Sequence, residues 1–238
     1  MNLTTSPLTA GLVATQKADN YNHWIWRHIK SHVSGLVLEA GSGLGTIADV
    51  LLDSGSRHLV LCDNDSRYIS YLRRKYANRK NIRIVNVDIS SSVAPRKLPR
   101  INTVVTINTL EHIQKDSQAI VHLAKILKPG GKLIVFVPAF DFLMGNWDKS
   151  IGHFRRYSKP GLEKQLTAAG LQIVSSSYFN LPGFFGWWLN KLIGRTPSDT
   201  LVKTQISLYD RFIVPWWSRL EESFTLPFGQ SIIVIGRK

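Results

Sequence analysis

Near the start of the chain, three glycines at alternate positions follow a short apolar run, a spacing that suits close contact between backbone and ligand. The run ends at Glu39, and the turn after it contains Gly41, Ser42, Gly43 and Gly45. Glycine allows the backbone to approach a ligand where a Cβ atom would intervene. The dinucleotide fingerprint G-x-G-x-x-G would need glycine at position 46, where this chain has threonine. A carboxylate at Glu39 also repels a pyrophosphate, so the pattern favours a cationic ligand, such as a sulfonium amino acid, over NAD.

Two further acids follow the next apolar runs of the chain. Asp63 and Asn64 come directly after the run HLVLC, and Asp88 and Ile89 come after NIRIVNV. A carboxylate at the end of a second strand can hold both ribose hydroxyls of a nucleoside, and one after the third strand can accept from an adenine amine. Each acid alone is explained equally well as a turn former or a helix N-cap. Because parallel strands end at one edge of a sheet, the acids together predict a nucleoside-containing ligand there.

Strand-like and helix-like segments alternate through most of the chain. Such an alternation would place the glycine loop and the acids at the ends of parallel strands. Apolar or β-branched runs predict strands over 35–39, 58–62, 81–87, 101–107, 132–137, 171–174 and 231–235. Amphipathic segments predict helices over 46–53, 66–76, 117–127 (with Asp116 as N-cap) and 158–169. Strands separated by helices form βαβ units, which predict an α/β fold with a mainly parallel sheet.

From Tyr21 to Phe140 the chain resembles the class I S-adenosylmethionine (SAM)-dependent methyltransferases, in particular the methyltransferase-11/12 group of small-molecule enzymes. The family's E-x-G-x-G-x-G loop corresponds to Glu39–Gly45, and its two strand-end acids correspond to Asp63 and Asp88. The family's LEH and LKPGG patterns are present as Leu110–His112 and Leu127–Gly131. About half of the chain matches strongly, and the motifs are specific for SAM rather than for the methyl acceptor.

The resemblance implies a Rossmann-like class I methyltransferase fold. Its sheet has seven strands and is mainly parallel, with an antiparallel last strand and helices on both faces. The implied cofactor is SAM, with S-adenosylhomocysteine (SAH) as product. The residues implied to contact it are Glu39, Gly41, Ser42, Gly43, Gly45, Asp63, Asn64, Asp88, Ile89 and Asn108.

Beyond the fifth predicted strand, polar side chains are candidates for the acceptor side of the site. Methyl transfer is an in-line displacement, so the protein mainly positions the reactants. An oxygen or protonated nitrogen acceptor also benefits from a base, and histidine suits that role. His153, oriented by Asp148, is our candidate base, with His112 a weaker one. A structural histidine in a loop explains His153 equally well.

The segment after His153 carries candidate substrate contacts. Arg155 and Arg156 are predicted to clamp a carboxylate or phosphate of the substrate, next to Tyr157. A solvent-facing pair of arginines is the alternative. Trp187 belongs to the aromatic stretch YFNLPGFFGWWLNKLIG and is the fourth candidate for substrate contact.

The region over 178–230 is too long for a plain connection between the last two strands and is rich in aromatic residues. We interpret it as an insert or lid over the acceptor. Core filling and contact with a bilayer, with Trp187, Trp188 and Lys191 at the interface, are the alternatives.

The charge of the chain is uneven as well as high. The formal net charge is +14, and residues 66–100 hold ten Lys or Arg against one acid. This segment is either a solvated face or a surface for an anionic partner, namely nucleic acid, an acidic membrane surface or a phosphorylated substrate.

Composition sets the remaining expectations. We predict one domain over residues 1–238 with a flexible N-terminus over 1–20, since no repeat or second domain is visible. No signal peptide or spanning segment is evident, so a cytoplasmic location, at the membrane periphery if the basic face binds lipid, is expected. Cys62 is the only cysteine and belongs to a predicted buried strand, and no group of residues has convincing metal-ligand spacing.

These features predict a SAM-dependent methyltransferase (EC 2.1.1.-) of a small molecule, anionic or lipid-linked, that works by in-line displacement. Three alternatives stay open: a nucleic-acid methyltransferase using the 66–100 face, a non-catalytic SAM-binding module, and an aminopropyl transferase. The turn at Asn108–Glu111 lacks the Pro-Pro-aromatic signature of amino-methylating DNA enzymes. A buried Cys62 also argues against cytosine-C5 chemistry.

Overall fold

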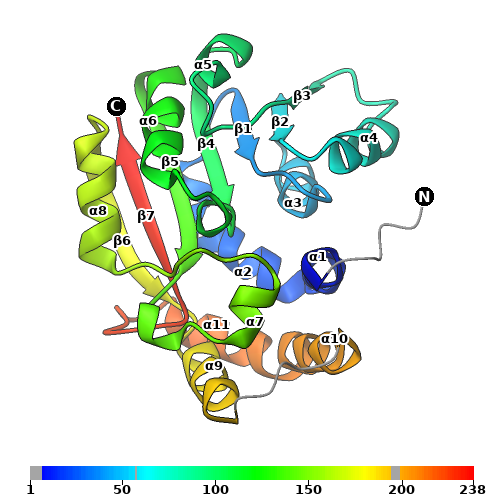
Figure 1. The fold of residues 1–238 in the computed structure, drawn as a ribbon, viewed down its shortest axis with the longest axis vertical. Coiled ribbons are helices and arrows are strands. Elements are labelled where there is room, and N and C mark those ends of the chain that lie inside the picture. The colour runs from blue at the N-terminus through cyan, green and yellow to red at the C-terminus, as the bar shows by residue number, and fades with distance from the viewer. Residues whose placement is uncertain (1–6, 57, 194–198) are drawn as a thin grey trace.

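One sheet forms the centre of the protein, which the computed structural model describes over residues 7–56, 58–193 and 199–238 (Figure 1). Its strands are β1 (Val37–Ala40), β2 (Leu59–Asp63), β3 (Ile82–Asn86), β4 (Ile101–Ile107), β5 (Leu127–Pro138), β6 (Gln172–Phe179) and β7 (Ser231–Arg237). They lie in the order β3-β2-β1-β4-β5-β7-β6. β7 is antiparallel to both β5 and β6, whereas the other neighbouring pairs are parallel. The predicted seven-stranded α/β sheet with an antiparallel last strand is therefore confirmed.

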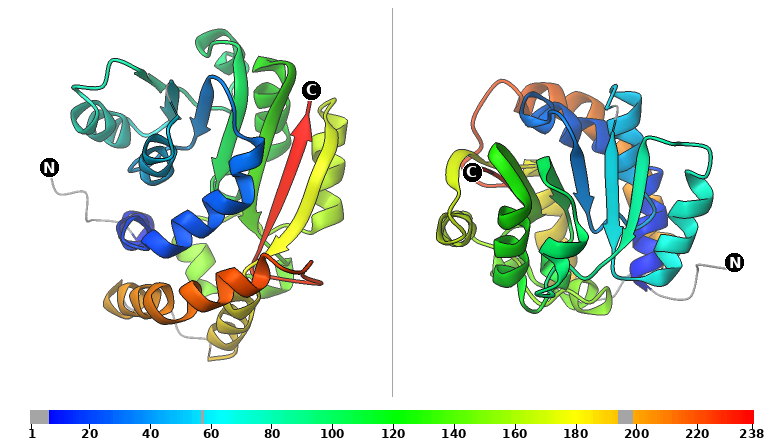
Figure 2. Two further views of the ribbon diagram at one scale, coloured as in Figure 1. Left: turned by 180° about the vertical axis from the view of Figure 1, so that it is seen from behind. Right: turned by 90° about the horizontal axis from the view of Figure 1, so that it is seen from above.

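Helices cover both faces of this sheet, as Figure 2 shows from behind and from above. One face packs against α5 (Ala94–Lys97), α6 (Asp116–Ile126) and α8 (Lys159–Ala168). The other face packs against α2 (Asp19–Ile29), α3 (Thr46–Asp53), α4 (Ser66–Lys75) and α11 (Val214–Glu221).

Alternating side chains of the central strands build the two cores. In β5, Leu133 and Val135 belong to the core beneath α6, whereas Ile134 and Phe136 belong to the core on the opposite face. All four are buried. Successive side chains of a strand point to opposite faces, so a continuous apolar run is what a strand covered on both sides requires.

Most element bounds lie close to those predicted, and the start of α6 is an instructive exception. The helix over 46–53 and the strand over 101–107 have the predicted bounds. Asp116 is not the N-cap of the next helix but its first residue. Its carboxylate accepts from the backbone amide of Ser117 and from the Tyr157 hydroxyl, both at 2.9 Å. A contact with a distant segment thus replaces the local capping role.

The N-terminal segment, for which we predicted flexibility over 1–20, is largely helical where the structure describes it. Its first six residues lie outside the described part of the chain, but α1 (Pro7–Gln16) is a helix and α2 follows closely. Thr9 Oγ1 lies 3.0 Å from the Tyr68 hydroxyl of α4. α1 also packs against α10 (Asp199–Leu208), so from residue 7 onward the segment has regular structure and tertiary contacts.

The predicted insert between the last two strands is largely helical. It contains α9 (Leu181–Ile193), α10, the π-helical turn η4 (Tyr209–Ile213) and α11. Figure 1 shows α9, α10 and α11 together at the end of the sheet where the parallel strands finish. Among the described residues, no helix is long and apolar enough to span a bilayer.

Candidate functional site

The loop between β1 and α3 is a tight turn that depends on its glycines. Gly41, Gly43 and Gly45 have φ angles of 78°, 48° and 70°, in the left-handed region that other residues rarely adopt. The amides of Gly41 and Ser42 donate to the Cys62 carbonyl at 2.9 and 3.0 Å, which fixes the loop at the end of β2. A Cβ atom at Gly41 would overlap the side chain of Thr109. The loop therefore presents bare backbone at the edge of the sheet.

Glu39 lies at the base of this loop and is 5% exposed. Within the described residues, its Oε2 atom has no hydrogen-bond partner. Burial, with a further contribution from the negative charge of Asp49, raises the pKa of Glu39 to about 8. A buried carboxylate oxygen without a donor is costly unless a cation or a ligand donor reaches it. The loop therefore fits the cationic amino-acid end of SAM.

Asp63 joins the end of β2 to the same loop. Its carboxylate accepts from the backbone amides of Gly43 and Asp65, both at 2.9 Å. Burial raises the pKa of Asp63. The adjacent Asn64 is exposed.

The two predicted adenine-side residues follow β3 with different exposures. Asp88 is exposed, and its Oδ1 accepts from the amide and the hydroxyl of Ser90 at 2.8 and 2.7 Å. Ile89 is buried, and its carbonyl lies 3.0 Å from Nδ1 of His122. Asp88 is thus also a turn former, the alternative that its sequence position left open.

The strand order places the predicted cofactor residues side by side along one edge of the sheet. Asp88 follows β3, Asp63 ends β2, and Glu39 lies in β1, which is the next strand along. Asn108 follows β4, on the other side of β1, with a φ of 48°. The neighbouring Thr109 donates to the Ala40 carbonyl at 3.2 Å, which ties the turn after β4 to the glycine loop.

On the far side of β4, the structure brings His153 and Asp148 together. Asp148 lies in α7 (Asn146–Ser150), and its Oδ1 is 2.9 Å from Nδ1 of His153. Its other carboxylate oxygen accepts from the Gly145 amide at 2.9 Å. Burial alone would raise the pKa of Asp148, but the hydrogen bond to His153 and the positive charge of Arg156 hold it below its usual value. Asp148 is therefore an anionic partner that orients the imidazole.

The predicted substrate clamp is engaged with carboxylates of the protein itself. Arg156 is 2% exposed and pairs with Asp148, with 2.8 Å between Nη2 and Oδ1. Arg155 forms an ion pair with Asp116, which also accepts from the Tyr157 hydroxyl. These contacts neutralise both guanidinium groups within the fold and give no support to a clamp on the substrate.

Trp187 reaches the same region from the insert. The guanidinium carbon of Arg156 lies 4.5 Å from the centroid of its ring. Nearby, Lys191 donates to the Phe142 carbonyl, and the rings of Phe140 and Phe184 meet edge to face at 5.7 Å. Helix α9 is thereby fixed onto the loop that follows β5.

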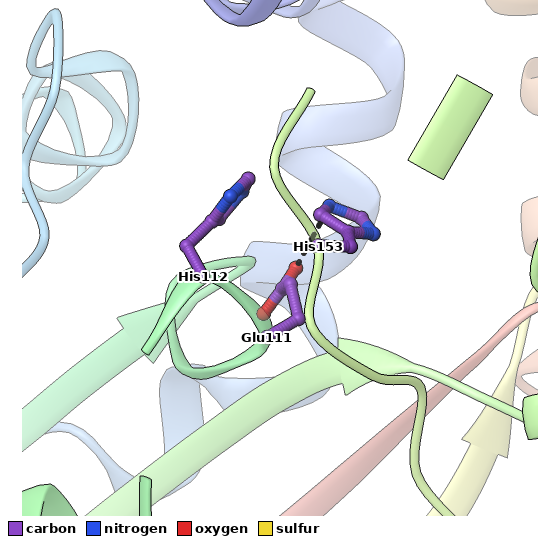
Figure 3. Close-up of side chains that lie close together, drawn as sticks. All are labelled: Glu111, His112 and His153. Carbon is purple, nitrogen blue, oxygen red and sulfur yellow. Dashed lines mark ion pairs between the residues drawn. The ribbon is translucent and has the colours of Figure 1, made fainter. Parts of the chain in front are cut away.

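Glu111 is a functional candidate that sequence reasoning missed. It lies in η2 (Leu110–His112), is fully buried, and its two carboxylate oxygens lack hydrogen-bond partners within the described chain. Burial raises the pKa of Glu111 to about 8. Its Oε1 lies 3.9 Å from Nε2 of His153, and the rings of His112 and His153 are 4.6 Å apart (Figure 3). The LEH motif was the available signal, but nothing local in the sequence joined it to His153.

The comparison with protein families agrees with this geometry. Residues 22–176, well over half of the chain, match the family described as a methyltransferase domain. The chain belongs to this family, which confirms the predicted class I methyltransferase and its cofactor, SAM.

A probable S-adenosylmethionine-dependent methyltransferase of Mycolicibacterium smegmatis is 27% identical over 161 residues. The match covers 64% of this chain and 60% of that protein, so the chain spans less than two thirds of its relative.

Two solved structures show how widely the fold is shared. The N-methyltransferase NodS from Bradyrhizobium japonicum, in complex with SAH, has a TM-score of 0.57 and 15% identity, covering 94% of this chain and 87% of NodS. The [4+2]-cyclase SpnF has a TM-score of 0.62 and 18% identity, covering 94% of this chain and 81% of SpnF. The fold therefore does not define the reaction, which depends on the site.

Proposed function

We propose that the protein transfers the methyl group of SAM to a small-molecule acceptor by in-line displacement. The observation that carries this proposal is the order of three carboxylates along one sheet edge, Asp88, Asp63 and Glu39, on neighbouring strands. The unpartnered oxygen of Glu39 supports a cationic ligand at the end of that series. Family membership supports the same cofactor.

The strand order also orients the proposed cofactor. Adenine would lie by Asp88 and Ile89, and the ribose hydroxyls would be held by Asp63 with Asn64 beside it. The amino-acid end would then lie on the glycine loop near Glu39. Because β4 is the next strand, the sulfonium methyl would face the turn at Asn108 and the residues beyond it.

The acceptor is proposed to bind on this far side, next to His153. Asp148 holds Nδ1 of the imidazole, which leaves Nε2 to take a proton from an oxygen or nitrogen acceptor. The acceptor atom then forms a bond to the methyl carbon while the carbon–sulfur bond breaks, and sulfur keeps the electron pair as a neutral thioether. Trp187 and the α9 aromatics supply apolar walls, a usual composition for a small-molecule site.

Calorimetry with SAM and SAH tests the cofactor half of this proposal, with NAD as the control ligand. We expect SAH to bind with a Kd in the micromolar range, which corresponds to about −8 kcal/mol. Absence of SAH binding, or tight NAD binding, would contradict it. Transfer of a labelled methyl group from SAM to candidate acceptors then separates an enzyme from a non-catalytic SAM-binding module.

Exposed apolar side chains support a second proposal, that the acceptor is reached at an anionic membrane surface. Helices α9 and α11 and the turn η4 expose a set of large side chains at one end of the molecule: Trp188, Leu189, Leu192, Phe212, Trp216 and Leu220. Basic residues accompany them as Lys191, Arg211 and Arg219. An amphipathic surface of this kind binds the interface of acidic bilayers.

The basic 66–100 segment supports the same partner, since Arg73, Arg74, Arg79 and Lys80 are exposed. Flotation with anionic and neutral vesicles, compared with an RNA gel shift at low and high salt, tests this. Retention by anionic vesicles supports the membrane, and salt-sensitive binding of RNA alone would favour nucleic acid instead.

A further inference from the structure

Three side chains from two separate segments converge beside the proposed acceptor position. Glu111 and His112 are adjacent in η2, and His153 comes from the loop after α7 (Figure 3). One ligand atom from each, an imidazole nitrogen or a carboxylate oxygen, lies within 4.8 Å of the other two. We propose that these three residues bind a divalent metal ion, a site that no motif in the sequence indicated.

The burial of Glu111 is the independent observation that points to a cation. The side chain is fully buried, and within the described ranges neither carboxylate oxygen accepts a hydrogen bond. Arg156, whose positive charge acts on Glu111, is already paired with Asp148. A buried carboxyl group with two unused oxygens needs a proton or a cation to compensate its desolvation. The two histidines place ligand nitrogens close to this carboxyl group.

His153 is oriented in the way that metal-binding histidines usually are. Its Nδ1 is 2.9 Å from the Asp148 carboxylate, so Nε2 is the nitrogen that faces Glu111. The 3.9 Å between Nε2 and Oε1 is too long for a hydrogen bond. Two ligand atoms at about 2.1 Å from one ion lie about 3.4 Å apart at a tetrahedral angle, so a bound ion would draw these two side chains slightly closer together. The Asp148–His153 pair therefore matches a carboxylate–histidine–metal arrangement.

The donor set indicates the kind of ion. Two imidazoles and one carboxylate suit Zn²⁺, Mn²⁺ or another first-row divalent ion, whereas Ca²⁺ prefers an all-oxygen set. Three protein ligands leave coordination positions open, as catalytic sites require. The inferred role rests on the proposed function: the ion would bind an acceptor hydroxyl and lower its pKa, so that the proton leaves to solvent before the oxygen attacks the methyl carbon. Nε2 of His153 would then act as a ligand and the ion would replace it as the activating group.

Titration of chelator-treated protein with Mn²⁺ and Zn²⁺ tests the inference, with Ca²⁺ as the comparison ion. Saturable binding of one ion per chain is expected, and Glu111→Gln should weaken it by on the order of 10–100-fold or more. The matched control is Glu39→Gln, which changes another buried glutamate outside the cluster and should leave metal affinity unchanged. Mn²⁺ electron paramagnetic resonance gives a second readout, because bound and free Mn²⁺ have different spectra.

Circular dichroism establishes that each variant is folded, and SAH binding provides a second check for the cluster variants. If Glu111→Gln does not fold, His112→Asn answers the same question, since its ring is partly exposed. Binding that stays weaker than about 1 mM in the parent protein, or equal affinity in parent and cluster variants, would overturn the site. SAH titration of the chelated protein is independent of the metal, so failure of the cofactor proposal is recognised separately.

Discussion

Two buried glutamates, one on each side of β4, differ in how the chain surrounds them. Glu39 on the cofactor side and Glu111 on the acceptor side both have a pKa raised to about 8 by burial. Both retain a carboxylate oxygen that no described residue satisfies. Glu39 lies beneath a loop of bare backbone, whereas Glu111 faces two imidazoles. The first environment suits an organic cation that needs close backbone contact, and the second suits a metal ion.

The largest expected effect comes from removing the imidazole on the acceptor side. We expect His153→Ala to lower turnover by about 10²–10⁴-fold, because either a proton acceptor or a metal ligand is lost. SAH affinity should stay nearly unchanged, since Glu39 and Asp63 are untouched. Steady-state kinetics and calorimetry on the same preparation measure both quantities. A parallel loss of SAH affinity and melting temperature would assign His153 to the support of the fold instead.

A large effect on stability is expected where the acceptor side holds a buried ion pair. Asp148→Ala leaves the guanidinium of Arg156 buried without its carboxylate, since Arg156 is only 2% exposed. The free energy of unfolding should fall by about 3–5 kcal/mol. Denaturant titration measures this, and the double variant Asp148→Ala/Arg156→Leu should recover part of the loss. An unchanged midpoint in the single variant would show that water or another group compensates Arg156.

The sequence suggested that Asp148 orients His153, but it did not indicate the pairing of Asp148 with Arg156 or the approach of Glu111 to His153. The glycine loop and the strand-end acids were predictable because each follows its own strand, and parallel strands end at a common edge. Asp116 was interpreted as an N-cap because its partners, Arg155 and Tyr157, lie far along the chain. A similar separation along the chain lies between Glu111 and His153, and local sequence patterns contain no information about such pairs.

The N-terminal segment also depends on contacts with residues far away in the sequence. Residues 7–16 carry no charged side chain and are mostly small, which suggested flexibility. Their helix is held by tertiary contacts with α10 and Tyr68, and Leu12 lies over Gly43 of the cofactor loop. Tertiary packing, rather than local helix propensity, determines whether such a segment forms a helix.

A smaller effect is expected from the ribose-side acid. Asp63→Ala should weaken SAH binding by about 1.5–3 kcal/mol, because it removes hydrogen bonds to a charged acceptor. Part of this loss would come from the glycine loop, since Asp63 accepts from the Gly43 amide. Calorimetry measures the loss, and Asp88→Ala provides a comparison at an exposed acid of the same edge. Undiminished affinity in Asp63→Ala would contradict the assigned cofactor position.

The smallest expected effect is the pH dependence that Glu39 contributes. Its pKa is about 8 in the ligand-free fold and near 4.5 when unperturbed. Between these values the folded state binds more protons than the unfolded state, so this group lowers the free energy of unfolding as pH rises. The positive α-ammonium group of SAH favours the ionised carboxylate, so SAH affinity should increase from pH 6 to 7.5, by at most about tenfold per pH unit. Glu39→Gln should remove this dependence, and a slope that persists in the variant would exclude Glu39 as its source.

Calorimetric titrations of both Glu39→Gln and Glu111→Gln, each with SAH and with Mn²⁺, test most directly whether the two glutamates serve different ligands. The division predicts that Glu39→Gln loses SAH affinity and keeps Mn²⁺ affinity, while Glu111→Gln keeps SAH affinity and loses Mn²⁺ affinity. If both variants lose the same ligand, or if neither changes either affinity, the two glutamates do not serve separate ligands.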